Sequence, residues 1–499
     1  MSKQDIKIAK SRDGKKSFEF VLTSNPPTGA MKYVYFSPKK DYVIGFFKDK
    51  QDARAIARLE SITDRYRHDI FEQIGGDYWK NLYCWPEEIV EWDGKIGIVV
   101  PSYAQNFFFQ FDKNRKGKEK QGKWFASAKL LRLMDKDEKG NFLTYLKISV
   151  KIAQAVRRMH TAGLAHSDLS YKNVLIDPHG GNACIIDIDG LVVPGKYPPD
   201  VLGTPDFIAP EVLSDKTRKT LPSQRTDKHA LAVLIYMYLL HRHPLRGGRF
   251  FGSDVEAEDE ELLLMGKDPL YIEHPTDKRN RNMKREYGDD LSKFQPWVDL
   301  DKFSAAKIAG PFLAALFERA FINGLQNPLS RPAAEEWENA LYKTCDRLLP
   351  CSNPACTGKW YVFDNSRIPC CPFCGTQYKG LVPKLEFYSC RAGSKTYKPD
   401  NHQLMVFNNQ SLSRWHVMNN IFPNEKISPE DRKRQAYFQF HNGTWLLVNE
   451  RLTSLFEVLP DGSKVQKKAR EFIELKDGTK ILLSTEEGGR LAVVQMAGK

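Results

Sequence analysis

His166-Ser-Asp-Leu-Ser-Tyr-Lys-Asn173 is the segment around which the chain is arranged, and two further motifs follow it. They are Cys184-Ile-Ile-Asp-Ile-Asp-Gly190 and Gly203-Thr-Pro-Asp-Phe-Ile-Ala-Pro-Glu211. Two short apolar runs, 173–177 and 183–187, flank the turn sequence 178–182, and this pattern predicts a β-hairpin. The hairpin would bring Asn173 and Asp187 to the same place in the fold.

Three side chains of these motifs have the functional groups of a magnesium-dependent acid–base site. A carboxylate such as Asp168 can accept the proton of a hydroxyl. Amide and carboxylate oxygens, here from Asn173 and Asp187, are the ligands that Mg²⁺ prefers. If the strand continues past Asp187, Asp189 points to the same face and assists with the metal.

The order of the motifs resembles that of the protein kinases, in which a catalytic loop H-R-D-x-x-x-x-N is followed by D-F-G and A-P-E. The resemblance implies an enzyme that transfers the γ-phosphate of ATP to a protein hydroxyl, with Asp168 as the base. Asn173 and Asp187 would hold Mg²⁺ with help from Asp189, and His166 would belong to the frame of the loop. Serine or threonine is the favoured acceptor.

Three positions depart from the kinase pattern. Ser167 replaces the arginine that clamps a phosphorylated activation segment, so we expect no such clamp. Lys172 follows Asp168 by four residues, where tyrosine kinases have an arginine and Ser/Thr kinases place their lysine at two, so the acceptor residue stays open. Asp187-Ile-Asp-Gly190 has one residue more than D-F-G. These departures leave a second class of function open, a pseudokinase scaffold that docks partner proteins.

Residues 17–48 alternate between apolar and polar side chains, which predicts three β-strands. The turn between the first two contains Gly29 and corresponds to the turn that covers the phosphates in kinases. Lys48, at the end of the third strand, is the expected ligand of the α- and β-phosphates, with Lys50 as the alternative. A helix from about residue 52 places Glu60 on its apolar face, where a carboxylate needs a partner. The resemblance makes Lys48 that partner, with Glu72 as the alternative to Glu60.

Two long helices are predicted in the larger lobe, over 142–160 and 225–240. Asp227 occupies the position of the helix N-terminal aspartate that steadies the catalytic loop in kinases. Arg331 is expected to pair with Glu211 and so to lock the activation segment to the lobe. The charged segment 112–140 is interpreted as a surface insertion. Proximity to the loop suggests three autophosphorylation sites, namely Thr204, Tyr197 and Thr226.

A cysteine-rich segment begins at residue 351. Cys351-x4-Cys356 and Cys371-Pro-Phe-Cys374 provide two pairs of thiols around a strand-like run, 359–363. Four thiolates arranged tetrahedrally suit structural Zn²⁺ and leave no open coordination position. Cys370 is the alternative to Cys371. The cysteine spacing indicates reduced thiols and a metal rather than disulfides.

Residues 381–499 consist of short strand-like runs separated by turns, which predicts a β-sandwich. Ser413-Arg-Trp-His416 and Val448-Asn449 resemble the landmarks of the forkhead-associated (FHA) domains, which bind phosphothreonine. The resemblance implies a phosphopeptide site of Ser413, Arg414, His416 and Asn449. Docking without phosphate is the favoured alternative, because no Gly-Arg precedes Ser413 and Glu450 replaces the expected glycine.

Composition and charge limit the remaining possibilities. The chain has 499 residues and a net charge of +13, which favours acidic partners, ATP included. The charge is spread along the sequence, so nucleic acid is not the favoured partner. The start has no apolar signal segment, and the longest apolar run, Ala230–Leu240, is shorter than the about 20 residues that a membrane span needs. We therefore expect a cytoplasmic protein.

The expected architecture is α+β with three domains. A bilobal protein-kinase-like domain covers 1–345, with the small lobe over 1–103 and the large lobe over 104–345. A zinc ribbon follows over 346–380, and an all-β FHA-like sandwich over 381–499. This order resembles the bacterial kinases of tellurium-resistance and stress systems. The resemblance implies two kinds of partner, a von Willebrand A-type protein and a metal-dependent protein phosphatase.

Overall fold

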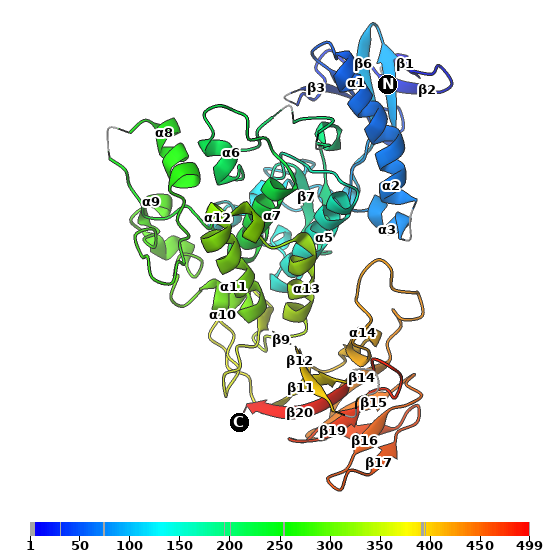
Figure 1. The fold of residues 1–499 in the computed structure, drawn as a ribbon, viewed down its shortest axis with the longest axis vertical. Helices are drawn as coiled ribbons and strands as arrows, with labels where there is room; N and C mark the ends of the chain where they lie inside the picture. The colour runs from blue at the N-terminus through cyan, green and yellow to red at the C-terminus, as the bar shows by residue number, and fades with distance from the viewer. Residues whose placement is uncertain are drawn as a thin grey trace. The chain divides into compact units, whose positions relative to one another are not determined.

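The computed structural model describes residues 5–29, 31–72, 75–193, 195–199, 201–252, 255–390, 394 and 396–498. The chain folds into two compact units, each built from separated parts of the sequence (Figure 1). Unit 1 comprises residues 1–140, 147–298 and 316–338, and unit 2 comprises residues 141–146, 299–315 and 339–499. The three-domain division expected from the sequence stays a prediction.

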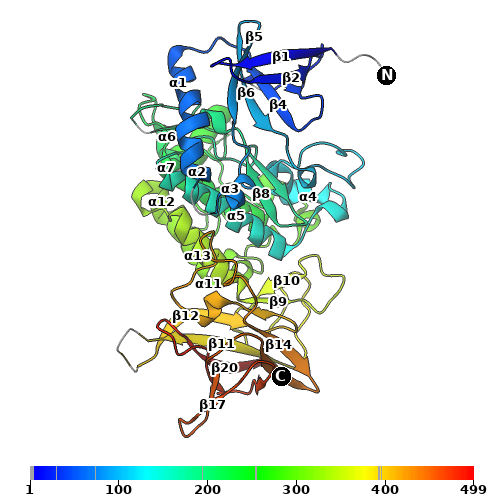
Figure 2. The same ribbon diagram turned by 90° about the vertical axis from the view of Figure 1, so that its right-hand side faces the viewer.

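Unit 1 begins with a six-stranded antiparallel sheet in the order β2-β1-β5-β6-β4-β3 (Figure 2). Its strands are β1 (Ile6–Ser11), β2 (Ser17–Val21), β3 (Lys32–Phe36), β4 (Tyr42–Phe47), β5 (Glu88–Trp92) and β6 (Lys95–Pro101). Alternate residues of the strands point into one core, because side chains along a strand alternate between its faces. The core residues are Ala9, Phe20, Ile44, Phe46, Val90 and Val99. The sheet curls so that its edge strands β2 and β3 approach each other.

The three strands predicted between residues 17 and 48 are present as β2, β3 and β4, but their order differs from the expectation. β2 pairs with β1, a strand that the sequence analysis did not predict, and not with β3. The segment between β2 and β3 therefore connects the two edges of the curled sheet. Near its end, Val34 N donates to Pro27 O and Gly29 N donates to Lys32 O.

Helix α1 (Ala53–Ser61) follows β4 and begins after Asp52, whose side chain accepts a hydrogen bond from Ala55 N. The other helices with all their residues in unit 1 are α2 (Arg67–Phe71), α3 (Gly76–Lys80), α4 (Ala128–Arg132), α6 (Pro210–Ser214), α7 (Gln224–Leu240), α8 (Ala257–Glu261), α9 (Lys284–Tyr287) and α12 (Gly324–Gln326). Three helices have residues in both units, namely α5 (Phe142–Thr161), α11 (Gly310–Glu318) and α13 (Ala334–Cys345), and α10 (Ala305–Ile308) belongs to unit 2.

The two long helices and the hairpin predicted from the sequence are confirmed. They are α5, α7 and the antiparallel pair β7 (Val174–Asp177) and β8 (Asn182–Ile185). Every residue of α7 from His229 to Leu240 is buried, so this helix runs through the core of the larger part of unit 1. A helix that is apolar all round is one that the fold surrounds.

The interpretation of residues 112–140 as a surface insertion is wrong. Lys120 Nζ lies 2.8 Å from Glu138 Oε2, and both side chains are almost completely buried. Glu138 Oε1 also accepts hydrogen bonds from Gln110 N and Phe111 N. A buried ion pair of this kind fixes the segment in place, because either charge alone would be costly in the interior.

Unit 2 contains a short antiparallel pair, β9 (Leu348–Pro350) and β10 (Trp360–Val362), and the predicted all-β sandwich. One sheet of the sandwich has the order β12-β11-β20-β19-β16-β17, and the other has the order β13-β14-β15-β18. The elements are β11 (Leu381–Ser389), β12 (Lys398–Met405), β13 (Ser411–Leu412), α14 (Arg414–Val417), β14 (Ala436–His441), β15 (Thr444–Asn449), β16 (Phe456–Val458), β17 (Lys464–Gln466), β18 (Phe472–Glu474), β19 (Lys480–Leu482) and β20 (Leu491–Gly498). Leu385, Phe438 and Leu447 are among the residues of its core.

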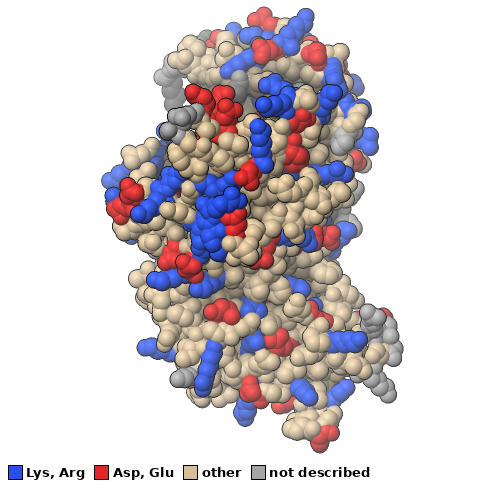
Figure 3. Space-filling model, turned by 60° about the vertical axis from the view of Figure 1, so that its left-hand side comes forward, with Lys and Arg blue, Asp and Glu red and all other residues tan. Residues whose placement is uncertain are grey.

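Two observations concern the surface of the molecule. Within the described residues, no helix has the length and the apolar character that crossing a membrane requires. On the face shown in Figure 3, basic side chains form one denser group and elsewhere are interspersed with acidic side chains.

Candidate functional site

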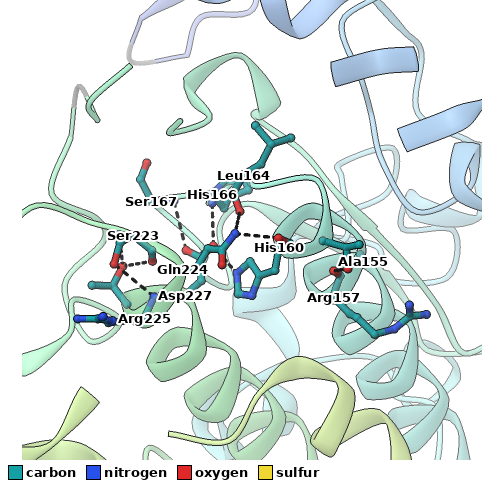
Figure 4. A network of polar contacts seen from close by, with 12 residues as sticks. Ala155, Arg157, His160, Leu164, His166, Ser167, Ser223, Gln224, Arg225 and Asp227 are labelled. Atoms are coloured by element: carbon teal, nitrogen blue, oxygen red, sulfur yellow. Dashed lines mark hydrogen bonds and ion pairs between the residues drawn. The ribbon is translucent and has the colours of Figure 1, made fainter. Parts of the chain in front are cut away.

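The loop 166–173 is held by Asp227 in the first turn of α7 (Figure 4). The Asp227 carboxylate accepts hydrogen bonds from the backbone N–H groups of His166 at 2.8 Å and Ser167 at 3.3 Å. It also lies 3.1 Å from His160 Nε2, at the end of α5. Ser167 has a positive φ of 65°, which is unfavourable for a residue other than glycine. Asp227 thus occupies the loop-steadying position expected from the sequence.

Asp168 and Asn173 meet inside this loop. Asn173 Nδ2 donates to the backbone oxygen of Asp168 at 2.8 Å and to its carboxylate Oδ2 at 2.9 Å. The other carboxylate oxygen, Asp168 Oδ1, is buried and has no hydrogen-bond partner among the described residues. An unpartnered buried oxygen costs free energy unless a ligand satisfies it. Asp168 Oδ1 is therefore an acceptor that no described residue uses.

Asp187 lies next to the loop because the hairpin brings it there. Ile186 N donates to Asn173 O at 3.0 Å, and His166 Nε2 donates to Ile186 O at 3.0 Å. The strand does not continue past Asp187 as expected, because Asp187 adopts the left-handed conformation (φ 61°, ψ 45°) and residues 188–190 form a 3₁₀ turn. The carboxylates of Asp187 and Asp189 nevertheless lie close together, because both contact the same ammonium group, that of Lys32.

Lys32 lies at the start of β3. Its Nζ lies 2.6 Å from Asp189 Oδ1 and 3.3 Å from Asp187 Oδ1. The side chain of Lys32 is 16% exposed, and burial alone would lower its pKa, but the charges of Asp189 and Asp187 raise the pKa above its usual value. Lys32 is consequently a firmly charged cation beside the two carboxylates, in the position where a kinase needs a lysine for the phosphates of ATP.

Gly45 in β4 makes room for Lys32. A Cβ atom added at Gly45 would lie 3.3 Å from Lys32 Cδ, which is a tight contact. Glycine inside a strand often marks a place where another group approaches closely. This glycine was the one signal in the sequence that could have indicated Lys32, and the sequence analysis did not use it.

Lys48 and Glu60 do not form the expected ion pair. Lys48 Nζ donates to Gly29 O at 2.8 Å and lies 5.3 Å from the ring centre of Tyr33, and its side chain is exposed. Glu60 is exposed and pairs with Arg12 at 2.6 Å. Lys48 follows the last residue of β4, three positions after Gly45. Successive residues of a strand face opposite sides, so Lys48 would not lie on the side of β4 where Gly45 faces Lys32. The alternative residues do not provide the expected lysine–glutamate pair either, because Lys50 is exposed and Glu72 pairs with His68.

Several other predicted residues are placed by the structure. Arg331 is fully buried and binds Glu211 through two hydrogen bonds, of 2.8 Å and 2.6 Å. Lys172 is exposed, and its backbone N–H donates to Ser170 Oγ. All three suggested autophosphorylation sites, Thr204, Tyr197 and Thr226, are buried. The Tyr197 hydroxyl contacts Ser61 Oγ and donates to Ala57 O, both on α1.

Four cysteines of unit 2 gather around one point. The sulfur atoms of Cys351, Cys356, Cys371 and Cys374 all lie within 4.8 Å of one another. The closest pairs are Cys351 with Cys374 at 3.5 Å and Cys356 with Cys371 at 3.7 Å. Zinc–sulfur bonds of 2.3 Å in a tetrahedron separate the sulfurs by about 3.8 Å, so the cluster fits structural Zn²⁺. Cys370 is not one of the four clustered cysteines, and its Sγ donates to Gly375 O at 3.4 Å.

The FHA-like residues of the sandwich have partners within unit 2. Asn449 is 1% exposed; its amide donates to Leu452 O and Lys467 O and accepts from Leu452 N. Arg414 pairs with Glu486 at 2.6 Å. Ser413 N donates to His416 Nδ1, and His416 Nε2 lies 3.1 Å from Asp346 Oδ1. Three of the four side chains expected to bind phosphate, those of Arg414, His416 and Asn449, therefore make internal contacts.

Comparison with known proteins finds similarity over part of unit 1. The protein kinase domain family matches residues 127–292. The serine/threonine-protein kinase PknD of Chlamydia felis is 31% identical over 127 residues, which are 21% of this chain and 13% of that protein. PknD of Chlamydia muridarum is 27% identical over 196 residues, 33% of this chain and 20% of that protein. Death-associated protein kinase dapk-1 of Caenorhabditis elegans is 33% identical over 100 residues, 19% of this chain and 7% of that protein.

The chain thus spans a fifth or less of the length of these curated relatives. Among solved structures, ROP2 from Toxoplasma gondii, a virulence factor with a protein-kinase fold and no enzymatic activity, aligns with a TM-score of 0.39 at 13% identity. The alignment covers 68% of this chain and 84% of that one, and a score this low supports no argument. The kinase match includes the loop, the hairpin and the segment that ends at Glu211. Residues 127–292 therefore match the protein kinase domain family, and bacterial serine/threonine kinases are among the relatives of this chain.

Proposed function

We propose that the chain is a protein kinase that transfers the γ-phosphate of ATP to a serine or threonine hydroxyl of a protein. The observation that carries the proposal is the free, buried oxygen of Asp168 beside Asn173, in a loop that the hairpin joins to Asp187. Identity to bacterial serine/threonine kinases supports the choice of acceptor. The lysine at four residues after Asp168 is the one feature that favours tyrosine.

Each residue of the site has a role that its contacts support. Asp168 Oδ1 accepts the proton of the acceptor hydroxyl. Asn173 and Asp187 supply the oxygen ligands for Mg²⁺, and Asp189 holds the ammonium group of Lys32. Lys32, and not Lys48, carries the positive charge that orients the α- and β-phosphates. ATP bound with magnesium supplies the phosphoryl group and the charge neutralisation that phosphate transfer requires.

A test uses the full chain with ATP and Mg²⁺, and phosphorylated residues are identified by mass spectrometry. We expect autophosphorylation or phosphorylation of an added protein such as casein by the wild type. Asp168→Asn keeps the shape of the side chain and removes the base, so the rate should fall about 100-fold or more. The same rate in both proteins would exclude Asp168 as the base and reject the proposed mechanism.

A non-catalytic scaffold is the second candidate, and one observation favours it. Asp168 lines a hollow of only about 10 Å³, together with Gly203, Thr204 and other residues of the activation segment. This space is about the size of one water molecule, so a substrate side chain would need the segment to move. If neither the wild type nor Asp168→Asn transfers phosphate, while both bind partner proteins, the scaffold is the better description.

The zinc ribbon and the sandwich are proposed to be docking modules. The Cys₄ geometry supports structural zinc, and the internal contacts of Arg414 and Asn449 favour an FHA-like fold that docks without phosphate. The cytoplasmic location is proposed from the sequence alone. The resemblance in domain order supports the tellurium-resistance or stress context. It also supports the two partners, a von Willebrand A-type protein and a metal-dependent phosphatase. Co-purification of the full chain with each candidate partner tests them.

A further inference from the structure

A cavity of about 410 Å³ lies in unit 1, apart from the residues of the kinase site. Its lining residues come from the end of α3 and the residues after it, from the end of β6 and the residues after it, from α5 and from β8. Figure 2 labels these four elements. Lys32, Asp168, Asn173 and Asp187 do not contribute to its walls. The volume is in the range of about 300–1,000 Å³ that is typical of small-molecule sites.

The charge of this cavity is positive. Lys80 and Lys151 line it, and no aspartate or glutamate is among its described lining residues. Lys80 Nζ is paired with Asp77 at 3.1 Å, an exposed carboxylate outside the cavity. The ammonium group of Lys151 has no carboxylate and no hydrogen-bond acceptor among the described residues, and its one contact is with the Tyr78 ring, 5.7 Å from the ring centre.

Lys151 is also partly removed from water. Burial lowers its pKa, and the positive charge of Lys147, one turn earlier on α5, lowers it further. A half-buried cation without a counter-ion is costly. An anion in the cavity would offset this cost, whereas a neutral or cationic ligand would not.

The rest of the wall combines apolar and aromatic groups with four polar side chains, those of Asn81, Ser102, Asn106 and Asn182. Tyr83, Tyr103 and Phe107 contribute rings, and Cys84 and Cys184 contribute buried thiols. The side-chain nitrogens of the three asparagines are already used, since Asn81 donates to Asp77 O and the other two donate to Asp177 Oδ2. A flat aromatic group can therefore pack on the rings, while Lys151 suits a negative charge at one end.

We propose that this cavity binds a small organic anion with a flat aromatic body, and that Lys151 is the counter-charge of its acidic group. The proposal concerns binding and does not depend on phosphate transfer. Its walls include β8, which ends two residues before Asp187, and residues 101–104, which follow the last strand of the sheet. A bound ligand would thus contact β8, which leads to Asp187, and the segment that follows the six-stranded sheet.

The test uses the full chain and 8-anilino-1-naphthalenesulfonate, an aromatic anion whose fluorescence rises in an apolar site. Lys151→Met keeps the length of the side chain and removes the charge, and it should weaken binding about tenfold or more. Lys147→Met is the matched control, because Lys147 is exposed on the same helix and does not line the cavity. It should bind as the wild type does.

Two further measurements separate this cavity from other apolar surfaces. The uncharged analogue N-phenyl-1-naphthylamine should bind the wild type and Lys151→Met equally, because it has no acidic group. Ala104 is exposed and lines the cavity, so Ala104→Trp should block the entrance and abolish saturable binding without disturbing the core. Equal binding of the sulfonate by wild type, Lys151→Met and Ala104→Trp would overturn the proposal.

Discussion

Lys32 brings its charge to Asp187 and Asp189 from β3, whereas Lys48 lies beyond the end of β4. The two lysines are therefore a natural pair for comparison. Lys32→Ala should lower phosphate transfer about 100-fold, because it removes the charge proposed to orient the α- and β-phosphates. Lys48→Ala should leave the rate near that of the wild type, because Lys48 contacts the backbone oxygen of Gly29.

The measurement is the initial rate of transfer from radiolabelled ATP by each variant, with circular dichroism to show that both are folded. If Lys48→Ala loses as much activity as Lys32→Ala, the assignment of Lys32 is wrong. If Lys32→Ala is as active as the wild type, its ion pairs with the two aspartates serve the fold alone.

The sequence predicts the positions of some site residues well and of others poorly, and the reason is how far apart in the chain the interacting segments lie. Asp168, Asn173 and Asp187 lie in one loop and one hairpin, so their proximity follows from local structure. Lys32 reaches the same place only because β3 pairs with β4 and the sheet curls, and such pairing between distant segments is not visible in a local pattern. Alternation of apolar residues indicates that a strand exists but does not name its neighbour.

Among the elements, helix α7 and the turn after it bury three histidines in a part of the fold that excludes water. Burial lowers the pKa of His229, His241 and His243 below the usual value near 6.5, in the case of His241 to about 4. Below pH 6.5 the unfolded chain takes up protons at these positions while the folded chain does not. The free energy of unfolding should therefore fall as the pH falls from 6.5 towards 4.

Each such histidine contributes a slope of up to about 1.4 kcal/mol per pH unit in that window. Urea unfolding of the full chain at pH 7.5, 6.5 and 5.5 measures the effect. His241→Gln should remove about a third of the slope. A free energy of unfolding that stays constant down to pH 5.5 would show that the three histidines protonate in the folded state.

The sequence predicts helices and strands correctly where a segment is long and strongly patterned, as in α5 and α7. The prediction is wrong where charged side chains are buried in ion pairs. Residues 112–140 are rich in charged side chains, and a buried pair such as Lys120 with Glu138 cannot be distinguished from solvated charges without the partner in view. The landmark Ser413-Arg-Trp-His416 was recognised, yet its histidine binds Asp346, a residue outside the sandwich.

For the whole molecule, the cysteine cluster lies in a unit that three separate parts of the chain build. Phe373, between Cys371 and Cys374, packs on Phe142 and Phe303 at ring distances of 5.4 Å and 5.3 Å. We expect about one zinc ion per chain. The double variant Cys351→Ser and Cys356→Ser should lose the metal and lower the melting temperature, because zinc binding contributes to folding.

Cys370→Ser is the matched control, because Cys370 is not one of the four clustered cysteines and its loss should not affect zinc content. Elemental analysis and a thermal melt of the three proteins give the answer. A wild-type protein that is folded and free of zinc would contradict the metal assignment. Loss of zinc in Cys370→Ser would instead favour Cys370 over Cys371 as the fourth ligand.

The discontinuous make-up of unit 2 has a practical consequence for anyone who wishes to produce the kinase domain by itself. A fragment cut after residue 345 would retain residues 141–146 and 299–315 but lose the ribbon that covers them. The rings of Phe142 and Phe303, now 4% and 1% exposed, would be uncovered together. Such a fragment would tend to aggregate, because it exposes apolar rings. Its low solubility would then result from the position of the cut and not from low stability of the remaining domain.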